Sequence, residues 1–190
     1  GKSGQYLLDH PDLCKLAFTG STEIGKNVAL AAANKLIPAT LELGGKSANI
    51  IFNDCNWEAA IDGVQLGILF NQGQVCCAGS RVFVQEDIYD KFVAELVNAF
   101  QHINVGDPLN PETQMGAQIN RHQADKILSY VQIAKEEGAT IACGGDYYTE
   151  NGCDVFLFVM TSILDDSSGM LAFGDEAEEI CSRAFQTKFV

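Results

Sequence analysis

Basic residues are scarce in this sequence. Twelve Lys and Arg stand against 25 Asp and Glu, so the 190-residue chain has a formal net charge of -13 at pH 7. Proteins that hold nucleic acid by its phosphates need clustered Lys and Arg side chains. The charge balance therefore argues against nucleic acid as a partner.

Metal-ligand spacing and long apolar runs are missing as well. The three histidines lie far apart and no Cys-x-x-Cys pair occurs, so we predict no metal site. No apolar run approaches the ~18 residues of a membrane-spanning helix, and we expect no membrane partner. The first residues, GKSG, include no initiator Met and do not lead into an apolar leader, so we expect the chain to begin within a longer protein.

The seven cysteines do not form a regular disulfide framework. Their number is odd and their spacing irregular, at positions 14, 55, 76, 77, 143, 153 and 181. Free thiols favour a reducing compartment. We therefore expect a cytoplasmic protein, with the mitochondrion as the alternative.

Short apolar runs alternate with helical patterns along the chain. We predict strands at 14–18, 40–43, 47–52, 81–84 and 139–142, and helices beginning at Ser21, Asn56, Asp87 and Asn120. This alternation predicts an α/β fold with mostly parallel open sheets and flanking helices. After residue 145 the pattern weakens: 155–160 is strand-like, and 167–179 has no clear period.

One reactive residue type stands in an accessible context. The segment 70–81, FNQGQVCCAGSR, places Cys76 in a loop of small residues between a predicted helix and a predicted strand. A thiolate is a strong nucleophile, and small neighbours allow a substrate to approach it. The alternative is that Cys76 and Cys77 are small core residues.

A second segment carries a candidate base. In 41–46, LELGGK, Glu42 lies between two leucines at the end of a strand. If the leucines exclude water, desolvation suits this carboxylate to general-base catalysis. Alternatively, Glu42 faces solvent and the glycine pair forms an ordinary turn.

A third segment runs from a strand into a helix start. In 18–26, FTGSTEIGK, Ser21 is the expected N-cap. Free backbone N–H groups at a helix N-terminus attract phosphate. The segment matches neither GxGxxG nor the P-loop, because Asn27 follows Lys26. An ordinary capped helix is the alternative interpretation.

Together the three segments resemble the NAD(P)-dependent aldehyde dehydrogenase superfamily, especially its cytosolic and mitochondrial aldehyde and retinal dehydrogenases. Further agreement lies at 106–119, GDPLNPETQMGAQI, and in EEGATIACGG, which ends at Gly145. The resemblance is strong over 1–145 and weak beyond. It implies an aldehyde dehydrogenase-like fold truncated at both ends. Residues 1–44 would be the C-terminal part of the NAD-binding domain, and 45–190 an incomplete, thiol-bearing catalytic domain.

The resemblance also implies roles for individual residues. Cys76 matches the family nucleophile, with Cys77 its neighbour, and Glu42 matches the general base. The residues that match the family's pyrophosphate contacts are Gly20, Ser21 and Gly25. Leu43 and Gly44 match its nicotinamide contacts, and Gln123, Lys126 and Glu179 match its ribose contacts. Lys126 could instead be a solvated helix lysine. Arg81 is expected to brace the cysteine loop, with a surface salt bridge as the alternative.

The implied reaction is oxidation of a small-molecule aldehyde to a carboxylic acid with NAD, or alternatively NADP, through a thiohemiacetal and a thioester on Cys76. The parent enzyme would be a homo-oligomer. Two features depart from the family. Its oxyanion-binding Asn and ribose-binding Lys have no counterpart here, and Glu178-Glu179-Ile180 is followed by Cys-Ser-Arg in place of Phe-Gly-Pro. The alternatives are therefore a non-catalytic fragment with an interaction or structural role, or a cofactor-independent thiol esterase.

Overall fold

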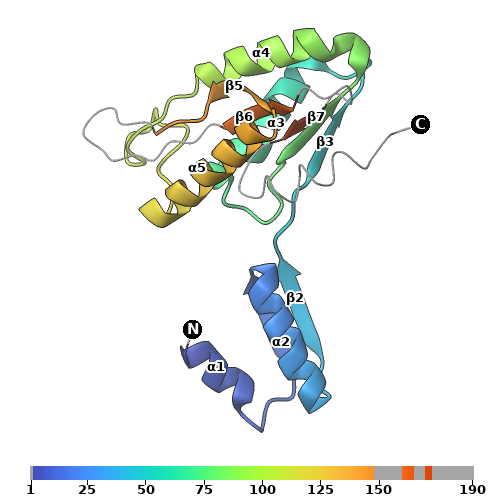
Figure 1. Ribbon diagram of the computed structural model, residues 1–190, viewed down its shortest axis with the longest axis vertical. Coiled ribbons are helices and arrows are strands. Elements are labelled where there is room, and N and C mark those ends of the chain that lie inside the picture. The colour runs from blue at the N-terminus through green and yellow to red at the C-terminus, as the bar shows by residue number, and fades with distance from the viewer. Residues whose placement is uncertain (1, 148–159, 165–169, 173–190) are drawn as a thin grey trace. The chain divides into compact units, whose positions relative to one another are not determined.

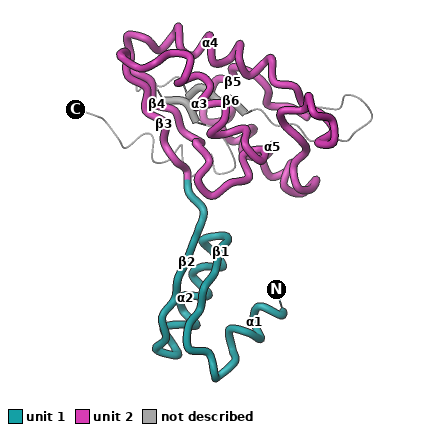
Figure 2. Tube along the Cα trace, turned by 180° about the vertical axis from the view of Figure 1, so that it is seen from behind, with its two compact units in different colours: residues 1–45 teal, residues 46–190 magenta. Residues whose placement is uncertain are grey.

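The computed structural model describes residues 2–147, 160–164 and 170–172, the last two ranges as strands (Figure 1). The chain divides into two compact units, Gly1–Gly45 and Lys46–Val190, which Figure 2 colours separately. Each unit has its own strands and helices.

The first unit consists of α1 (Lys2–Asp9), β1 (Leu16–Gly20), α2 (Thr22–Lys35) and β2 (Ala39–Leu43). The two strands pair in parallel, with Leu16 opposite Ala39 and Gly20 opposite Leu43. Helix α2 is the crossover between them and packs on the strands through Leu16, Val28, Ala32 and Leu41. The first unit is therefore a small β-α-β arrangement preceded by α1.

Local signals account for most of the first unit. Ser21 caps α2 as predicted, because its Oγ accepts a hydrogen bond from the Ile24 N–H at 3.3 Å. Strand β1 begins at Leu16 and ends at Gly20, two residues later than the predicted 14–18. Helix α1 was not predicted. It spans only eight residues and buries none of them, although Leu8 packs against the apolar cluster of the first unit.

The second unit contains the larger sheet. Its strands are β3 (Ala48–Ile51), β4 (Arg81–Val84), β5 (Thr140–Gly144), β6 (Met160–Leu164) and β7 (Met170–Ala172), in the order β3-β4-β7-β6-β5. The helices are α3 (Trp57–Leu69), α4 (Tyr89–Gln101) and α5 (Arg121–Glu136), with short 3₁₀ turns η1 (Phe70–Gly73) and η2 (Glu86–Ile88). Strand β4 has the predicted bounds, and Asn56 caps α3 as predicted. Asn120, the predicted start of a helix, caps α5.

The α/β fold class is confirmed, and the sheets add detail to it. Parallel pairing occurs where a helix connects the strands, in β1–β2 and β3–β4. The pairs β4–β7, β7–β6 and β6–β5 are antiparallel. Strand β7 was not predicted, because three residues are too few to show a period. The predicted strand at 155–160 lies outside the described residues except at Met160, where β6 begins.

The core of the second unit lies between the sheet and two helices. Phe92 and Leu96 of α4, Val64 of α3 and Val82 of β4 are all almost fully buried. The Phe92 ring meets the Trp57 ring edge-on at 5.4 Å. Helix α5 packs separately, through Ile127 and Val131 against Ile141 of β5. This rigid frame carries the loop between α3 and β4 (Figure 1).

Candidate functional site

In the first unit the predicted cofactor residues meet at one edge of the sheet. Because β1 and β2 are parallel, their carboxyl ends lie at the same edge. Gly20 is opposite Leu43 in the register, and Thr19 is opposite Glu42. The Gly20-Ser21 turn therefore lies beside the end of β2 and Gly44. In α/β sheets this edge is where ligands bind.

Gly25 fixes the distance between α2 and the end of β2. It is buried, and a Cβ atom at this position would lie 2.5 Å from Leu43 Cδ2 and 2.9 Å from Cδ1. A larger residue would push Leu43 away from the helix. Gly25 thus sets the position of Leu43, the residue predicted to lie beside the nicotinamide.

The start of α2 can accept an anion. Residues 20–23 are exposed, and Ser21 Oγ occupies only the Ile24 N–H. The N–H groups ahead of it have no acceptor within the helix. They point along the axis of a 14-residue helix, whose dipole favours negative charge at this end. These features fit a pyrophosphate.

The exposure of Glu42 distinguishes the two interpretations that the sequence left open. Its side chain is exposed, whereas Leu41 and Leu43 are half-buried. Successive side chains of a strand point to opposite faces, so the two leucines turn towards α2 and leave Glu42 on the other face. In the first unit they do not shield the carboxylate from water, contrary to the idea drawn from their adjacency.

The thiol loop, defined here as residues 70–80, opens with an unusual turn. Asn71, Gln72 and Gly73 have φ of 48°, 58° and 75°. Glycine adopts this left-handed region freely, but a non-glycine residue there costs roughly 1–3 kcal/mol. The Asn71 side chain offsets part of this cost by donating to the Gln74 carbonyl at 3.1 Å. The turn therefore needs support from its surroundings.

Cys76 and Cys77 form the accessible part of the loop. Both are exposed and have free thiols, whereas the next three residues are buried. This placement rules out the alternative that they are core cysteines. Within the chain as described, the backbone N–H groups of Cys76 and Cys77 donate to no carbonyl, although the neighbouring Ala78 N–H bonds to the Val75 carbonyl at 3.1 Å. Two donors therefore lie next to the sulfur.

The far end of the loop is anchored on the frame. The Gly79 N–H donates to the Gly67 carbonyl at 2.8 Å. Asn49 Nδ2 of β3 donates to the carbonyls of Gly79 and Arg81 at 3.2 and 3.3 Å. Arg81 Nε donates to the Lys46 carbonyl at 2.9 Å, so the Arg81 side chain braces the segment that leads into β3 and not the loop itself. Sequence reasoning missed Asn49, whose partners lie 30 and 32 residues away.

The near end of the loop is held by residues that sequence reasoning also missed. Gln118 Nε2 donates to the Gln72 carbonyl at 3.1 Å, and the Ile119 N–H donates to Gln74 Oε1 at 3.1 Å. These contacts bring the segment before α5 to the loop. The sequence signal was weak, because the partners are 45 and 46 residues apart.

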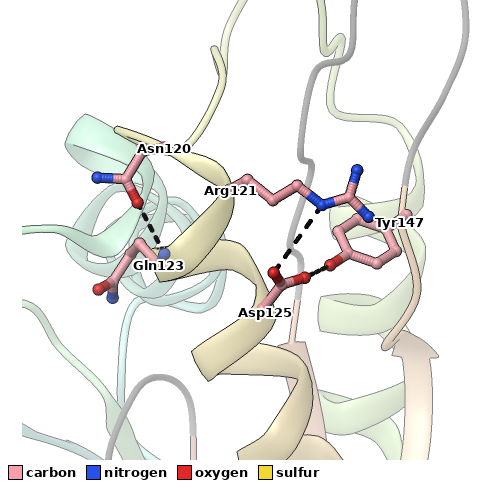
Figure 3. Close-up of polar contacts among 5 residues, drawn as sticks. All are labelled: Asn120, Arg121, Gln123, Asp125 and Tyr147. Atoms are coloured by element: carbon pink, nitrogen blue, oxygen red, sulfur yellow. Dashed lines mark hydrogen bonds and ion pairs between the residues drawn. The ribbon is translucent and has the colours of Figure 1, made fainter.

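Helix α5 starts directly after these contacts (Figure 3). Asn120 Oδ1 accepts from the Gln123 N–H at 2.9 Å, and the Gln123 side chain is half-buried. Lys126 is exposed, with Nζ 5.7 Å from the centre of the Tyr130 ring. Gln123 thus lies four residues after Ile119, which contacts the loop, and Lys126 is three residues further along the same helix with its side chain exposed to solvent.

A polar group joins two residues of α5, Arg121 and Asp125, to Tyr147, which follows β5 (Figure 3). The Tyr147 hydroxyl donates to Asp125 Oδ1, and Arg121 Nε lies 3.9 Å from Asp125 Oδ2. The hydrogen bond to this carboxylate, with a smaller effect of burial, raises the pKa of Tyr147 above its usual 10.0. The Arg121 charge opposes the rise. The group ties the segment after β5 to α5.

The remaining predicted features are as follows. Glu179 lies outside the described residues. Glu42 belongs to the first unit and Cys76 to the second. Over residues 2–147 and the two described strands, no group of three or more His, Cys, Asp or Glu side chains could hold a metal ion. In the same part of the chain, no helix has both the length and the apolar character to cross a membrane.

Comparison with known proteins places this site in context. The sequence model described as "Aldehyde dehydrogenase family" matches residues 1–177. Human 4-trimethylaminobutyraldehyde dehydrogenase is 42% identical over 204 residues, which cover 98% of this chain and 41% of that protein. The chain thus spans less than half the length of this relative.

Solved structures agree with the sequence match. Betaine aldehyde dehydrogenase from Staphylococcus aureus, in complex with NAD+, superposes with a TM-score of 0.83 at 40% identity, over 87% of this chain and 33% of that one. PnpE in complex with nicotinamide adenine dinucleotide gives a TM-score of 0.79 at 41% identity, over 84% and 33%. The family model and the sequence identity show the same relationship, and the solved structures share the fold: this chain belongs to the aldehyde dehydrogenase family.

Proposed function

We propose that this chain supplies the nucleophile and the general base for oxidation of an aldehyde to a carboxylic acid with NAD, NADP being the alternative. The observation that carries the proposal is the exposed Cys76 thiol with two unpaired backbone N–H groups beside it. A nucleophile with adjacent oxyanion donors is the arrangement that acyl chemistry requires. Similarity to dehydrogenases crystallised with NAD+ supports the choice of cofactor.

Cys76 performs the first step. Its thiolate attacks the carbonyl carbon, so a carbon–sulfur bond forms and the carbonyl oxygen becomes an oxyanion. In the proposed step the N–H groups of Cys76 and Cys77, which have no carbonyl acceptor in the described chain, donate to that oxygen. Because the loop is anchored at both ends, these donors need little reorganisation when the charge develops.

The first unit holds the cofactor. The start of α2, with Gly20, Ser21 and Gly25, would hold the pyrophosphate, and Leu43 and Gly44 would contact the nicotinamide; the parallel register that brings these residues to one sheet edge supports this assignment. Gln123 and Lys126, with Glu179, contact a ribose. A bound nicotinamide cofactor would supply the acceptor for the hydride that leaves the substrate carbon, and Cys76 would then carry the acyl group as a thioester.

Glu42 performs the last step. Its carboxylate removes a proton from water, the resulting hydroxide attacks the thioester, and the carbon–sulfur bond breaks. The acid departs and the Cys76 thiolate is restored. In this scheme residues 1–44 act as the C-terminal part of a cofactor-binding domain, and residues 45–190 act as the thiol-bearing catalytic domain.

The test measures aldehyde-dependent NADH formation by the full 190-residue chain. Betaine aldehyde and 4-trimethylaminobutyraldehyde are suitable substrates, because proteins similar to this chain carry their names. Cys76→Ser should abolish NADH formation, and Cys77→Ser, its matched control, should retain it. Glu42→Gln should allow up to one NADH per chain and leave an acyl group on Cys76, detectable by mass spectrometry.

Two outcomes contradict the proposal. One is NADH formation that survives Cys76→Ser. The other is the absence of both NADH and an acyl adduct in a folded chain that binds NAD+ in a direct titration, a result that supports the non-catalytic interpretation. Turnover of an activated ester without cofactor would instead support the esterase alternative.

A further inference from the structure

We propose that Gln118 is a positioning residue for Cys76, acting from outside the thiol loop by holding the left-handed turn Asn71–Gly73. This inference rests on the proposed function only in taking Cys76 as the nucleophile. The structural claim is that the Gln118 amide determines where the Cys76 sulfur lies.

The contact between Gln118 and the turn is direct and buried. Gln118 is 5% exposed, and its Nε2 donates to the Gln72 carbonyl at 3.1 Å. Nearby, a Cβ atom on the buried Gly116 would lie 3.5 Å from Gln72 Nε2. The segment 116–118 therefore lies against the turn, with room for no more than one methyl group between Gly116 and the Gln72 side chain.

Gln74 closes the contact from the loop side. Its Oε1 accepts from the Ile119 N–H at 3.1 Å, and its Nε2 donates to Gln72 Oε1 at 3.1 Å. Gln72 is thus held at its carbonyl by Gln118 and at its side chain by Gln74. Met115 fixes the segment in turn, by packing with Val105 and the end of α3 in a small apolar cluster.

A packing role alone does not account for Gln118. A buried amide is unfavourable unless it is hydrogen-bonded, and an apolar side chain of similar shape fills space at lower cost. In the described chain, Gln118 Oε1 has no hydrogen-bond partner, so the bond to Gln72 is the contact that the amide group makes. Non-glycine residues stay left-handed only where their surroundings impose it.

The position of Cys76 follows from this support. The Val75 N–H bonds to the Gly73 carbonyl at 2.9 Å, so the backbone that reaches Cys76 is continuous with the turn. The other end of the loop is fixed at Gly79. If Gln72 relaxes to a right-handed conformation, the backbone leaves the turn in a different direction while Gly79 stays anchored. Cys76, which lies between the turn and Gly79, must then move.

The experiment measures alkylation of the full 190-residue chain by iodoacetamide, with rates for Cys76 and Cys77 resolved by tandem mass spectrometry. Gln118→Met keeps the volume and removes the donor. It should lower the Cys76 rate roughly 2- to 10-fold, the factor that corresponds to one net hydrogen bond, and leave the Cys77 rate unchanged. Gln132→Met is the matched control, because Gln132 is exposed on α5 and bonds only within that helix, to Glu136.

In the Gln118→Glu variant, lowering the pH should restore the hydrogen-bond donor that the substitution removes. At low pH its neutral carboxyl can donate to the Gln72 carbonyl as the amide does, and when ionised it has no proton to donate. The ratio of Cys76 to Cys77 rates should therefore match that of the unsubstituted chain at low pH and fall as the carboxyl ionises. A purely structural role predicts equal changes at both cysteines, with a lower melting temperature and no rescue.

Equal rates at Cys76 in Gln118→Met and Gln132→Met, or no pH-dependent rescue in Gln118→Glu, would overturn the positioning role. Alkylation needs neither aldehyde nor cofactor. Failure of this proposal is therefore distinct from failure of the proposed function, which the NADH assay on Cys76→Ser detects.

Discussion

Gly79 gives the sharpest stability prediction, because an added methyl group has a defined target. A Cβ atom there would lie 2.5 Å from Asn49 Nδ2 and 3.2 Å from its Oδ1. That same amide donates to the carbonyls of Gly79 and Arg81. Gly79→Ala must therefore displace Asn49 and break both hydrogen bonds.

The magnitude follows from these two effects. Two hydrogen bonds contribute about 1 kcal/mol each, and overpacking in a buried site adds about 1–3 kcal/mol. Gly79→Ala should destabilise by about 3–5 kcal/mol, and Asn49→Ala, which loses only the bonds, by about 2 kcal/mol. In the double variant Gly79→Ala/Asn49→Ala, the two hydrogen bonds of Asn49 are lost only once, and the added methyl group no longer meets the Asn49 side chain. The two effects should therefore fall short of additivity by about 2 kcal/mol or more.

The assay is urea unfolding followed by tryptophan fluorescence. Trp57 is the single tryptophan of the chain and packs on Phe92 in the core that Asn49's strand helps to form, so its signal reports the second unit. Gly63→Ala is the control: this exposed helix position has no atom within 4 Å of an added Cβ. It should stabilise α3 by up to about 1 kcal/mol. Additive effects of Gly79→Ala and Asn49→Ala, within ~0.5 kcal/mol, would refute the reasoning.

Three further predictions concern other parts of the chain. The pKa of Tyr147, followed by ultraviolet absorbance, should lie above the usual 10.0, and Asp125→Asn should lower it. Because the folded-state pKa is raised, this contact stabilises the fold below pH 10, and the contribution is lost as pH rises through the folded value. An unchanged titration in Asp125→Asn would contradict the assignment. Phe92→Ala, at a fully buried position, should cost about 3–5 kcal/mol in urea unfolding, whereas Leu66→Ala, 67% exposed, should change stability by less than ~1 kcal/mol. Similar costs for the two would mean that burial does not govern these positions. Ser21→Ala should cost about 1 kcal/mol, seen as faster hydrogen exchange of the first α2 amides; protection equal to the parent's would show that the cap is not needed.

Features encoded by neighbouring residues could be predicted from the sequence. Ser21, Asn56 and Asn120 each cap a helix through a bond to the third residue on, and such a signal needs only a few positions. The bounds of β4 likewise follow from a short apolar run. Exposure of Cys76 was predicted from the small residues that surround it.

Features that depend on distant residues could not be predicted in this way. The Gln118–Gln72 bond joins positions 46 apart, and no local pattern marks either residue. The left-handed conformation of Asn71 and Gln72 has the same origin, because it is imposed from outside the loop. Glu42 illustrates a different point. Its neighbours Leu41 and Leu43 suggested a carboxylate shielded from water, but adjacent side chains of a strand point to opposite faces of the sheet.

The register between β1 and β2 determines which face of the sheet carries Glu42. Side chains alternate along a strand, so sliding β2 by a single position would turn the carboxylate towards α2 and put a leucine in its place. The stretch 36–38, which joins α2 to β2, sets that count, and the Leu16 N–H bond to the Pro38 carbonyl at 3.0 Å holds it. One residue inserted in this connection would therefore turn the Glu42 carboxylate towards α2 without altering any residue to which we assign chemistry.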